Sequence, residues 1–470
     1  MSNCKNLIFY PGVNYIYILK VVFTACTRLE TYCKIAIVGG GILGTSIAYF
    51  LSSLCGSKIL VIEQEKNVAL HTSSRNTGKV HAPFLYDPLK KKLFAKAAFL
   101  GYDMWHRYSD LRQVLFKQDG VMEVAVNEEG MDRIHKYMEW GVENGLRPEK
   151  EIKILQKEDV KKSEPSVNCH GALYCSRDAS ADYGLLTRNL FYDAQSFECR
   201  FLLGHRLRRV TQSHTDGLTL TLQDGEKQKT INTEFLINVA GGNALDIAHS
   251  MNLAHDYTDF HFRGEYWQAP TRYRNLTKLS IYSVPTVPEY PFLDPHWIVR
   301  IDGRREVGPN AVPVFGPYAY NWKTNLKYFI PKTFESLKAR GAQKILVDTQ
   351  FLRLVSNELK SSVSKSSMIN RVKRFLPQIK ISDFSKKGTS GIRSILVNKD
   401  GRFVPDTLIL KDWRSVHVLN YNSPGATGAL PVAAMIADQL FENGVAAPGH
   451  DQPKSKTIFD FREVAHNMST

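Results

Sequence analysis

The sequence has few cysteines, no long apolar run and no low-complexity segment. Its seven cysteines include no C-x-x-C pair, and no His/Cys cluster has zinc-ligand spacing, so we expect no structural metal. This cysteine usage is typical of a reducing compartment, and it argues against a disulfide scaffold. Hydrophobic residues at 43% and charged residues at 23% are ordinary for globular chains. Disordered, collagenous and fibrous classes are therefore excluded.

Acidic residues are outnumbered by basic ones. Lys and Arg total 61 against 46 Asp and Glu, a formal net charge of +15. Such a surface can favour nucleic acid, anionic lipid or a small anionic ligand. The basic residues lie in short scattered groups and no helix-turn-helix or zinc-finger pattern is present, so we expect no nucleic-acid partner. An anionic cofactor and an anionic substrate need only a locally positive cleft, so a basic solvated surface is the default interpretation of the charge.

The apolar stretch of residues 15–26 is too short to cross a membrane. A span needs about 20 apolar residues, and Lys20 interrupts this one. No A-x-A-like cleavage site follows, and a mitochondrial presequence would be richer in arginine. We expect residues 1–33 to be an extension outside the fold and the protein to be cytoplasmic. Peripheral membrane contact through this extension is an alternative.

A βαβ nucleotide-binding pattern opens the folded part of the chain. Residues 34–38 (KIAIV) predict a strand, and residues 39–44 (GGGILG) fit G-x-G-x-x-G. A helix pattern over 45–54 and a strand over 58–62 follow, and the second strand ends in Glu63. Spacing of this kind is typical of dinucleotide-binding units. The alternative is a glycine-rich turn in an unrelated α/β fold.

Each residue of this fingerprint has a physical task. Gly39 permits the tight turn, Gly41 lets the backbone approach the pyrophosphate, and Gly44 lets helix and strand pack closely. The helix N-terminus offers free N–H groups and a positive dipole end to the diphosphate. Glu63 can accept hydrogen bonds from the ribose hydroxyls.

Three later segments favour FAD over NAD. The small polar loop 71–78 can wrap the pyrophosphate, and the strand 234–239 runs into an Ala-Gly turn that can close over the nucleotide. The strand 416–420 feeds a loop and a helix whose N-terminus can face the negative charge of reduced flavin. Any one of them could be an ordinary strand-to-helix turn. The FAD contacts expected from them are Ser73, Ser74, Arg75, Asn76, Thr77, Gly78, Ala240, Gly241, Ser423, Pro424, Gly425, Ala426 and Thr427.

Taken together, these segments resemble the D-amino-acid-oxidase-like FAD oxidoreductases, and more closely the L-2-hydroxyglutarate dehydrogenase/oxidase family. The resemblance extends from about Lys34 to Leu440. Besides the fingerprint, it rests on Asn76-Thr77-Gly78 with His81, Glu164-Pro165, Asp182-Tyr183, F-R-G-E-Y at 262–266, Pro291-Phe292-Leu293, G-P-N-A at 308–311, Gly391-Ile392-Arg393 and Ser423-Pro424-x-Ala426-Thr427.

The chain also departs from that family's pattern. Four single positions differ. The family usually has His where this chain has Arg75, a hydrophobic residue where it has Lys79, Gly where it has Pro83 and Gln where it has Ile395. It has Asn-Ala-Pro-Ser-Pro where residues 420–424 read Asn-Tyr-Asn-Ser-Pro. We expect these positions to lie on loops that touch the substrate or the flavin edge.

The resemblance implies a chemistry and a set of site residues. The reaction would oxidise a 2-hydroxy acid, first of all L-2-hydroxyglutarate to 2-oxoglutarate, by hydride transfer to flavin N5. Histidine titrates near neutral pH and arginine forks bind carboxylates. The implied roles are a base at His81, carboxylate anchors at Arg393 and Arg263 with Arg75 and Lys79 added, hydrogen-bond donors at Tyr266 and His296, and a flavin contact at Gly391. Each could instead be a packed or salt-bridged side chain.

The predicted fold class is α/β (α+β overall). We expect a Rossmann-like FAD-binding domain with an inserted substrate domain built on a mixed or antiparallel sheet. A helical stretch over 324–355 and a solvated helix with a loop over 358–374 are predicted. The expected limits are 34–110, 155–255 and 385–445 for the FAD-binding domain, 111–154 and 256–384 for the substrate domain, and 446–470 for a C-terminal tail.

Two other functions stay open. The first is an FAD-dependent amine or amino-acid oxidase of the sarcosine, glycine or proline type, against which the F-R-G-E-Y and G-P-N-A phrases argue. The second is a non-catalytic flavin-binding or tRNA-associated protein, against which the presence of His81 and Arg393 argues. The electron acceptor can be oxygen, a quinone or a protein.

Overall fold

The computed structural model describes residues 31–212, 217–285, 294–446 and 457–469. Nearly all of the predicted N-terminal extension, including residues 15–26, lies outside the described residues, as does the Pro291-Phe292-Leu293 phrase. The first strand begins at Tyr32, earlier than the predicted Lys34, because Tyr32 and Cys33 already pair with Asn232 and Thr233.

An eight-stranded sheet forms the core of the nucleotide-binding part. Its strands are β1 (Tyr32–Val38), β2 (Ile59–Ile62), β9 (Arg200–Leu202), β10 (Arg206–Gln212), β11 (Leu218–Asp224), β12 (Lys227–Asn238), β21 (Leu408–Asp412) and β22 (Ser415–Leu419). The order is β10-β11-β12-β1-β2-β9, and β22 pairs with β12 and β21. The strands β22, β12, β1, β2 and β9 are joined by parallel pairings, as the βαβ pattern predicts.

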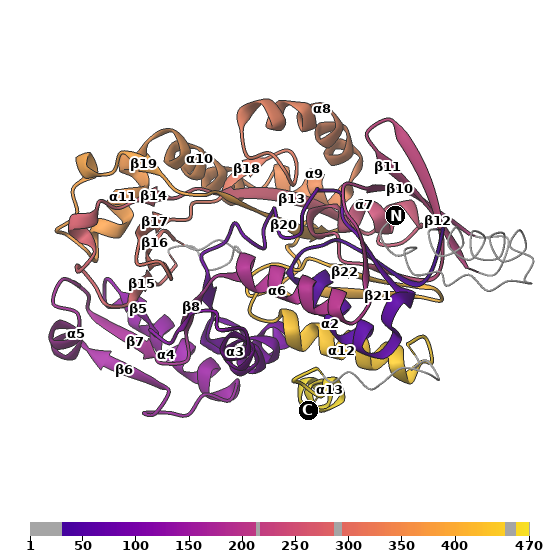
Figure 1. The fold of residues 1–470 in the computed structure, drawn as a ribbon. Coiled ribbons are helices and arrows are strands. Elements are labelled where there is room, and N and C mark those ends of the chain that lie inside the picture. The colour runs from indigo at the N-terminus through magenta and orange to yellow at the C-terminus, as the bar shows by residue number, and fades with distance from the viewer. Residues whose placement is uncertain (1–30, 213–216, 286–293, 447–456, 470) are drawn as a thin grey trace, which may run out of the picture.

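One face of this sheet is covered by helices, which are grouped at the lower centre of Figure 1. They are α2 (Ile42–Cys55), α3 (Lys92–Arg112), α6 (Tyr183–Ser196), α12 (Ala429–Glu442) and α13 (Phe461–Ser469). Helix α2 is buried nearly all round, which explains why its sequence is apolar without a polar face. On the other face of the sheet, the small helix α7 (Ala244–Ser250) contributes Ile247 to the apolar cluster, and Met251, the residue after the helix, also packs there.

A second eight-stranded sheet lies to the left in Figure 1. Its strands are β5 (Val121–Ala125), β6 (Ile152–Gln156), β7 (Gly171–Cys175), β14 (Trp267–Gln268), β15 (Ser280–Ser283), β16 (His296–Val299), β17 (Arg305–Gly308) and β19 (Lys386–Lys387). All pairings are antiparallel except that of β5 with β15, so the sheet is mixed and the predicted fold class is confirmed. Helix α4 (Glu129–Glu143) packs against β5, β6 and β7, and the short helix α5 (Lys157–Ser163) adjoins β6.

The pairing of strand β7 bears on the expected domain limits. Strand β7 falls within 155–255, the range predicted for the FAD-binding domain, yet it pairs along its length with β5 and β6. Its apolar residues Ala172 and Leu173 belong to the core of the second sheet. We propose that the two large sheets are the cores of two domains and that residues up to Cys175 belong with the second.

Two three-stranded sheets connect these parts. One has the order β18-β13-β20 and consists of β13 (Tyr257–Gly264), β18 (Val312–Val314) and β20 (Gly391–Asn398). The other has the order β3-β8-β4 and consists of β3 (Lys79–Val80), β4 (Phe116–Lys117) and β8 (Ala179–Ala181). The first carries Arg393 opposite Phe262, and the second carries Lys79 opposite Ser180.

The helical region that follows differs from the sequence prediction. In place of one stretch over 324–355 there are α8 (Trp322–Lys338), α9 (Arg340–Leu346) and α10 (Thr349–Val363), followed by α11 (Lys365–Lys373). Asp348 begins α10 by accepting hydrogen bonds from the backbone N–H groups of Gln350 and Phe351 at 2.8 and 3.0 Å.

Residues 358–374 are not the solvated segment that was predicted. Met368, Ile369 and Val372 of α11 are fully buried against the second sheet. Buried Glu358 forms an ion pair with Arg371 at 2.8 Å. The Ser/Lys-rich composition concealed this inward face, because the buried positions are few and separated by polar ones.

Within the described ranges, no helix is both long and apolar enough to cross a bilayer. Nor do three or more His, Cys, Asp or Glu side chains of the described residues come together as a metal site.

Candidate active site

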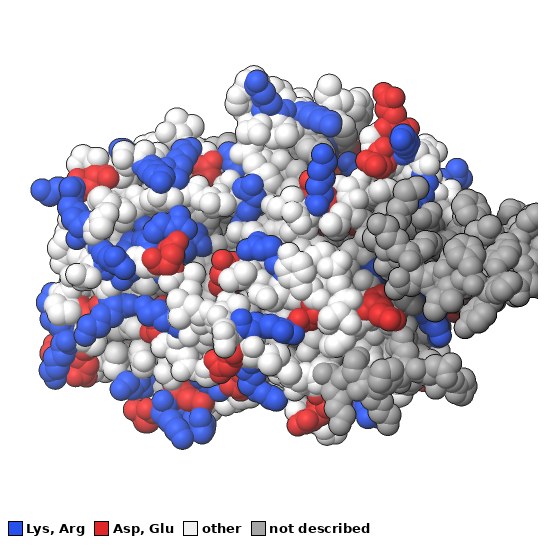
Figure 2. Space-filling view, viewed as in Figure 1, with Lys and Arg blue, Asp and Glu red and all other residues white. Residues whose placement is uncertain are grey.

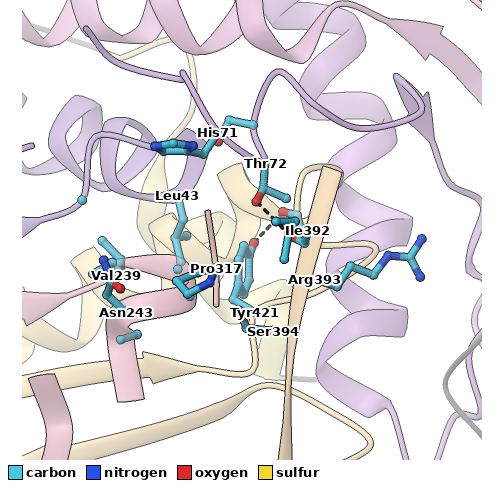
Figure 3. Close-up of a pocket in the computed structure, with 18 of the residues that line it drawn as sticks. Leu43, His71, Thr72, Val239, Asn243, Pro317, Ile392, Arg393, Ser394 and Tyr421 are labelled. Atoms are coloured by element: carbon cyan, nitrogen blue, oxygen red, sulfur yellow. Dashed lines mark hydrogen bonds between the residues drawn. The ribbon is translucent and has the colours of Figure 1, made fainter. Parts of the chain in front are cut away.

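A cavity of about 420 Å³ opens where parallel strands of the first sheet end. Val38 ends β1, Val239 follows β12 and Leu419 ends β22, and all three line it. This is the carboxyl edge of the sheet, the place where open α/β sheets bind ligands. The lining continues onto strands β13 and β20, so the connecting sheet β18-β13-β20 also contributes to it. Figure 3 shows Leu43, Val239 and Pro317 converging there.

The glycine fingerprint forms a close-fitting cradle. Gly39 has a φ of +118°, and a Cβ there would lie 2.5 Å from the carbonyl oxygen of Val239. A Cβ on Gly44 would lie 1.8 Å from the carbonyl oxygen of Gly39, so only glycine lets α2 pack this closely on the turn. Gly39 and Gly41 line the cavity, whereas Gly44 lies behind it, in agreement with its predicted packing task.

The start of helix α2 faces the cavity with its backbone donors. The N-cap residue Gly41 has no capping side chain of its own, and the backbone N–H of Ile42 donates to Ser73 Oγ at 2.9 Å. Glu63 accepts hydrogen bonds from the N–H groups of Gly40 at 2.6 Å and Glu65 at 2.8 Å. Burial raises the pKa of Glu63. The carboxylate is thus fixed at the end of β2, where a ribose would be recognised.

The loop 71–78 follows the cavity wall as predicted, with two exceptions. His71, Thr72, Ser73, Arg75, Asn76 and Thr77 line the cavity. Ser74 and Gly78 do not. Ser74 Oγ donates to the carbonyl oxygen of Ala69. Gly78 has a φ of +71°, and its backbone N–H donates to Asn76 Oδ1 at 2.8 Å. These two residues shape the loop and are not among its contacts.

Strand β20 of the connecting sheet β18-β13-β20 forms another wall of the cavity. Thr72 Oγ1 donates to the carbonyl oxygen of Ile392 at 3.2 Å, as drawn in Figure 3. A Cβ on Gly391 would lie 2.0 Å from the carbonyl oxygen of Arg75, so the strand and the loop are in direct contact. Ala240 and Gly241 line the same cavity after β12, as the sequence predicted.

The loop 421–428 before α12 forms another wall and is firmly anchored. Trp105 Nε1 donates to the carbonyl oxygens of Ala426 at 3.0 Å and Thr427 at 2.9 Å. Thr427 Oγ1 accepts a hydrogen bond from the backbone N–H of His81 at 3.1 Å. Tyr421 OH donates to the carbonyl oxygen of Gly425 at 2.7 Å, so this departure from the family pattern shapes the loop (Figure 3). Ser423, Pro424, Gly425, Ala426 and Thr427 all line the cavity.

His81 lies in the cavity wall as a neutral imidazole. Its side chain is 11% exposed, and burial lowers its pKa to about 3, with the charges of Lys79 and Arg393 adding to the effect. Its Nδ1 atom has no hydrogen-bond partner among the described residues and lies 3.8 Å from Asp178 Oδ2. At neutral pH the ring therefore has a nitrogen lone pair that can accept a proton.

Arg393 supplies a positive charge to the cavity. It lines the wall from β20, and its guanidinium group has no ion pair with any of the described residues. It lies close enough to lower the pKa of His81 and to oppose the burial-driven rise in the pKa of Tyr266. Figure 3 shows its side chain extending away from Leu43, Pro317 and Tyr421. An arginine in this state can bind a carboxylate in bidentate fashion.

Arg263, the other predicted anchor, is engaged elsewhere. Its Nη2 and Nε atoms contact Glu265 Oε1 at 2.7 and 3.1 Å, and Nη1 donates to the carbonyl oxygen of Ala319 at 3.1 Å. The side chain does not line the cavity. The anchoring role predicted for Arg263 is thus not supported, because Glu265 of the same F-R-G-E-Y phrase neutralises its charge.

Tyr266 and His296, the two predicted hydrogen-bond donors, are placed differently. Tyr266 lines the cavity, and the guanidinium of Arg300 lies 5.1 Å from its ring centroid. His296 lies outside the lining, buried against Tyr282 with 4.1 Å between ring centroids. Burial lowers the pKa of His296 to about 3, and neither ring nitrogen has a partner among the described residues. Direct contact of His296 with a substrate is therefore not supported.

Lys79 lines the cavity but is ion-paired, and Asp178 beside it is a residue that the sequence did not single out. Buried Lys79 lies 3.1 Å from Asp119 Oδ1 and 3.3 Å from Asp178 Oδ1, so its charge is already balanced. Burial raises the pKa of Asp178 to about 7, and Asp119 adds to the rise. No spacing rule links 79, 119 and 178, because only the small sheet β3-β8-β4 brings the three segments together.

Arg300 is a second residue that sequence reasoning missed. It forms an ion pair with Glu306 and donates to the backbone carbonyl of Asn76, which joins the loop 71–78 to strands β16 and β17. Arg75 is also occupied, since its guanidinium stacks on the ring of Tyr320 with 4.3 Å to the centroid.

Glu123 is a buried carboxyl group in β5, and its titration gives a testable pH dependence. Burial, with Asp294 adding to the effect, raises its pKa from 4.5 to about 8. Between pH 4.5 and about pH 8 the folded protein keeps this proton while the unfolded chain releases it. The free energy of unfolding therefore falls as the pH rises. One proton corresponds to a slope of about 1.4 kcal/mol per pH unit.

We expect Glu123→Gln to flatten the decline in melting temperature between about pH 6 and 8, because the amide cannot ionise. Circular dichroism melting curves at each pH measure this slope. The exposed Glu128, replaced in the same way, is the control and should leave the slope unchanged. Equal slopes for wild type and Glu123→Gln would contradict the expectation.

Comparisons with known proteins place this geometry among relatives. The family model described as FAD dependent oxidoreductase (DAO) matches residues 34–439. The mitochondrial L-2-hydroxyglutarate dehydrogenase of Caenorhabditis elegans is 30% identical over 413 residues, which cover 86% of this chain and 92% of that protein. The L-2-hydroxyglutarate dehydrogenase of Escherichia coli K12 is 27% identical over 406 residues, with coverage of 86% and 92%.

Solved structures share the fold at lower identity. L-α-glycerophosphate oxidase from Mycoplasma pneumoniae, with FAD bound, aligns with a TM-score of 0.69 at 20% identity, over 91% of this chain and 99% of that one. Glycine oxidase from Geobacillus kaustophilus aligns with a TM-score of 0.63 at 15% identity, over 93% and 98%.

Proposed function

This chain belongs to the DAO family of FAD-dependent oxidoreductases, and from that premise we propose that it oxidises L-2-hydroxyglutarate to 2-oxoglutarate. It is an enzyme whose cofactor is FAD. The proposed substrate is a small dianion with a hydroxyl group on C2. The names of the curated relatives support this choice, and so does the charge of the cavity.

The residues present fit FAD. The turn has no room for a side chain at Gly39 or Gly44, and the start of α2, from Gly41 to Leu43, lines the cavity where a helix N-terminus can hold a phosphate group. Glu63 is held where ribose hydroxyls can donate to it. Bound FAD supplies a hydride acceptor, N5 of its ring system, for the hydrogen that leaves C2.

Arg393 is the observation that carries the proposed substrate class. A guanidinium group that lines a cavity without a carboxylate partner among the described residues is a binding site for an anion. We assign it to the C1 carboxylate of the substrate, which places C2 beside His81. After burial and Lys79, its charge adds to the lowering of the pKa of the His81 imidazole.

His81 is assigned as the base. Its Nδ1 atom is buried beside Asp178, so we assign Nε2 as the atom that accepts the hydroxyl proton of C2. Tyr266, which also lines the cavity, can hold the same oxygen by a hydrogen bond. Asp178 is a positioning residue in this scheme. It lies next to the imidazole and favours the cationic ring that forms after proton transfer.

Anaerobic titration of the purified protein tests the proposal. Addition of L-2-hydroxyglutarate should bleach the flavin band near ~450 nm, whereas D-2-hydroxyglutarate should leave it unchanged. A yellow protein that bleaches with glycine, sarcosine or proline but not with the L acid would replace the proposed substrate by an amine. A flavin that none of these compounds reduces would favour a non-catalytic role.

A further inference from the structure

The outer face of helix α8 exposes an unusual number of large apolar side chains. They are Trp322, Leu326, Phe329, Ile330, Phe334 and Leu337, here called the α8 face, and each is 44–68% exposed. Their spacing of three and four residues places them along one side of the helix. Isolated exposed leucines are common on protein surfaces, but a contiguous apolar face marks a docking surface.

The opposite side of α8 fixes the helix to the body of the protein. Buried Lys332 forms ion pairs with Asp259 of β13 and with Glu335, the latter at 2.8 Å. Thr258 Oγ1 donates to Glu335 Oε1 at 3.1 Å, and Asn321 caps the first turn. The apolar face is therefore held outward by a rigid attachment, and helix α8 lies at the top of the molecule in Figure 1.

The charge around the α8 face indicates what covers it. Lys323, Lys327 and Lys338 are exposed on the same helix, and exposed Arg340 follows it. The only acidic residue of the helix, Glu335, is already paired with Lys332. Figure 2 shows Lys and Arg side chains over the top of the molecule, where α8 lies. A second copy of this face would bring like charges together, whereas an anionic lipid surface complements them.

We propose that the α8 face docks the enzyme onto the surface of an anionic membrane. An amphipathic helix with apolar and basic sides lies in the plane of the interface, with its apolar side in the acyl boundary and its lysines at the headgroups. Trp322 at the start of the helix suits that boundary, where the amphipathic indole ring is favoured. The attachment differs from the one predicted from sequence, which used residues 15–26, and it does not depend on the identity of the substrate.

Vesicle flotation with the full-length holoprotein tests this surface. Wild type should float with vesicles of phosphatidylcholine and phosphatidylserine, more weakly with phosphatidylcholine alone, and less at high salt because the lysine contribution is screened. The double variant Leu326→Asp/Ile330→Asp should lower the fraction bound to anionic vesicles at least ten-fold. Both sites are exposed, so FAD content and activity with a soluble dye acceptor should match wild type.

A matched pair of tryptophan variants provides the control. Trp322→Asp should weaken flotation, whereas Trp413→Asp, at a 55% exposed tryptophan between β21 and β22, should not. Equal binding by wild type and the double variant would overturn the proposal and place the contact elsewhere, for example in residues 15–26. Absence of flotation by wild type would also overturn it, as would a dimer that the double variant converts to a monomer without any vesicle binding.

Discussion

His81→Gln should slow flavin reduction by L-2-hydroxyglutarate by about 10²- to 10⁴-fold, the usual contribution of a positioned general base. Burial lowers the pKa of the wild-type imidazole to about 3, so the ring is unprotonated, which is the form that a general base requires. Glutamine keeps much of the volume but has no basic nitrogen. Stopped-flow spectroscopy under anaerobic conditions, with absorbance near ~450 nm, measures the rate.

Two further measurements make this result specific. The FAD content of His81→Gln should equal that of wild type, because the imidazole is not part of the glycine cradle. His106→Gln replaces a partly exposed histidine of α3 and should reduce at the wild-type rate. An unchanged reduction rate in His81→Gln would remove this residue from the role of base.

Arg393→Met should raise the dissociation constant for L-2-hydroxyglutarate about 10- to 150-fold. Hydrogen bonds to charged groups contribute about 1.5–3 kcal/mol, and every 1.4 kcal/mol corresponds to a factor of ten. Methionine is close in length but lacks the charge and the donors. The concentration dependence of the anaerobic reduction rate separates this effect on binding from any effect on the rate at saturation.

Arg263→Met is the matched comparison because the structure gives that arginine a different task. Its loss leaves Glu265 without its ionic partner, so we expect a lower melting temperature and little change in substrate affinity. If Arg263→Met instead weakened binding and Arg393→Met did not, the two assignments would have to be exchanged. The pair therefore tests the site in a way that either variant alone does not.

The nucleotide site could be predicted from sequence because its information is local. The turn at Gly39, the packing at Gly44 and the carboxylate of Glu63 all lie within one βαβ unit, where chain geometry leaves little freedom. The turn at 240–241 could be assigned for the same reason, since it comes just after β12, and the small polar loop 71–78 lies in the segment between β2 and β3. Ser74 and Gly78 do not line the cavity, and a loop's sequence pattern does not say which of its residues face inward.

Charged residues of the substrate region were beyond such reasoning. Both Arg263 and Arg393 stand in motifs that resemble the family. Only the folded chain shows that the guanidinium group of Arg263 already binds Glu265 and the carbonyl oxygen of Ala319. Lys79 looked like an added anchor until two carboxylates from distant segments were found beside it. Ion pairing depends on which segments meet in space, and a single sequence does not record that.

The sequence by itself thus determined an FAD-binding α/β fold, and the resemblance to a family implied the roles of a histidine and an arginine in its motifs. Short-range geometry and amphipathic period are enough for the nucleotide-binding unit, since both act within a few turns or strands. Tertiary structure alone decided that Arg263 and not Arg393 is ion-paired among the described residues, which carboxyl groups are buried and which face of α8 points outward. Each of these depends on burial, and burial is set by contacts between residues that are far apart in the chain.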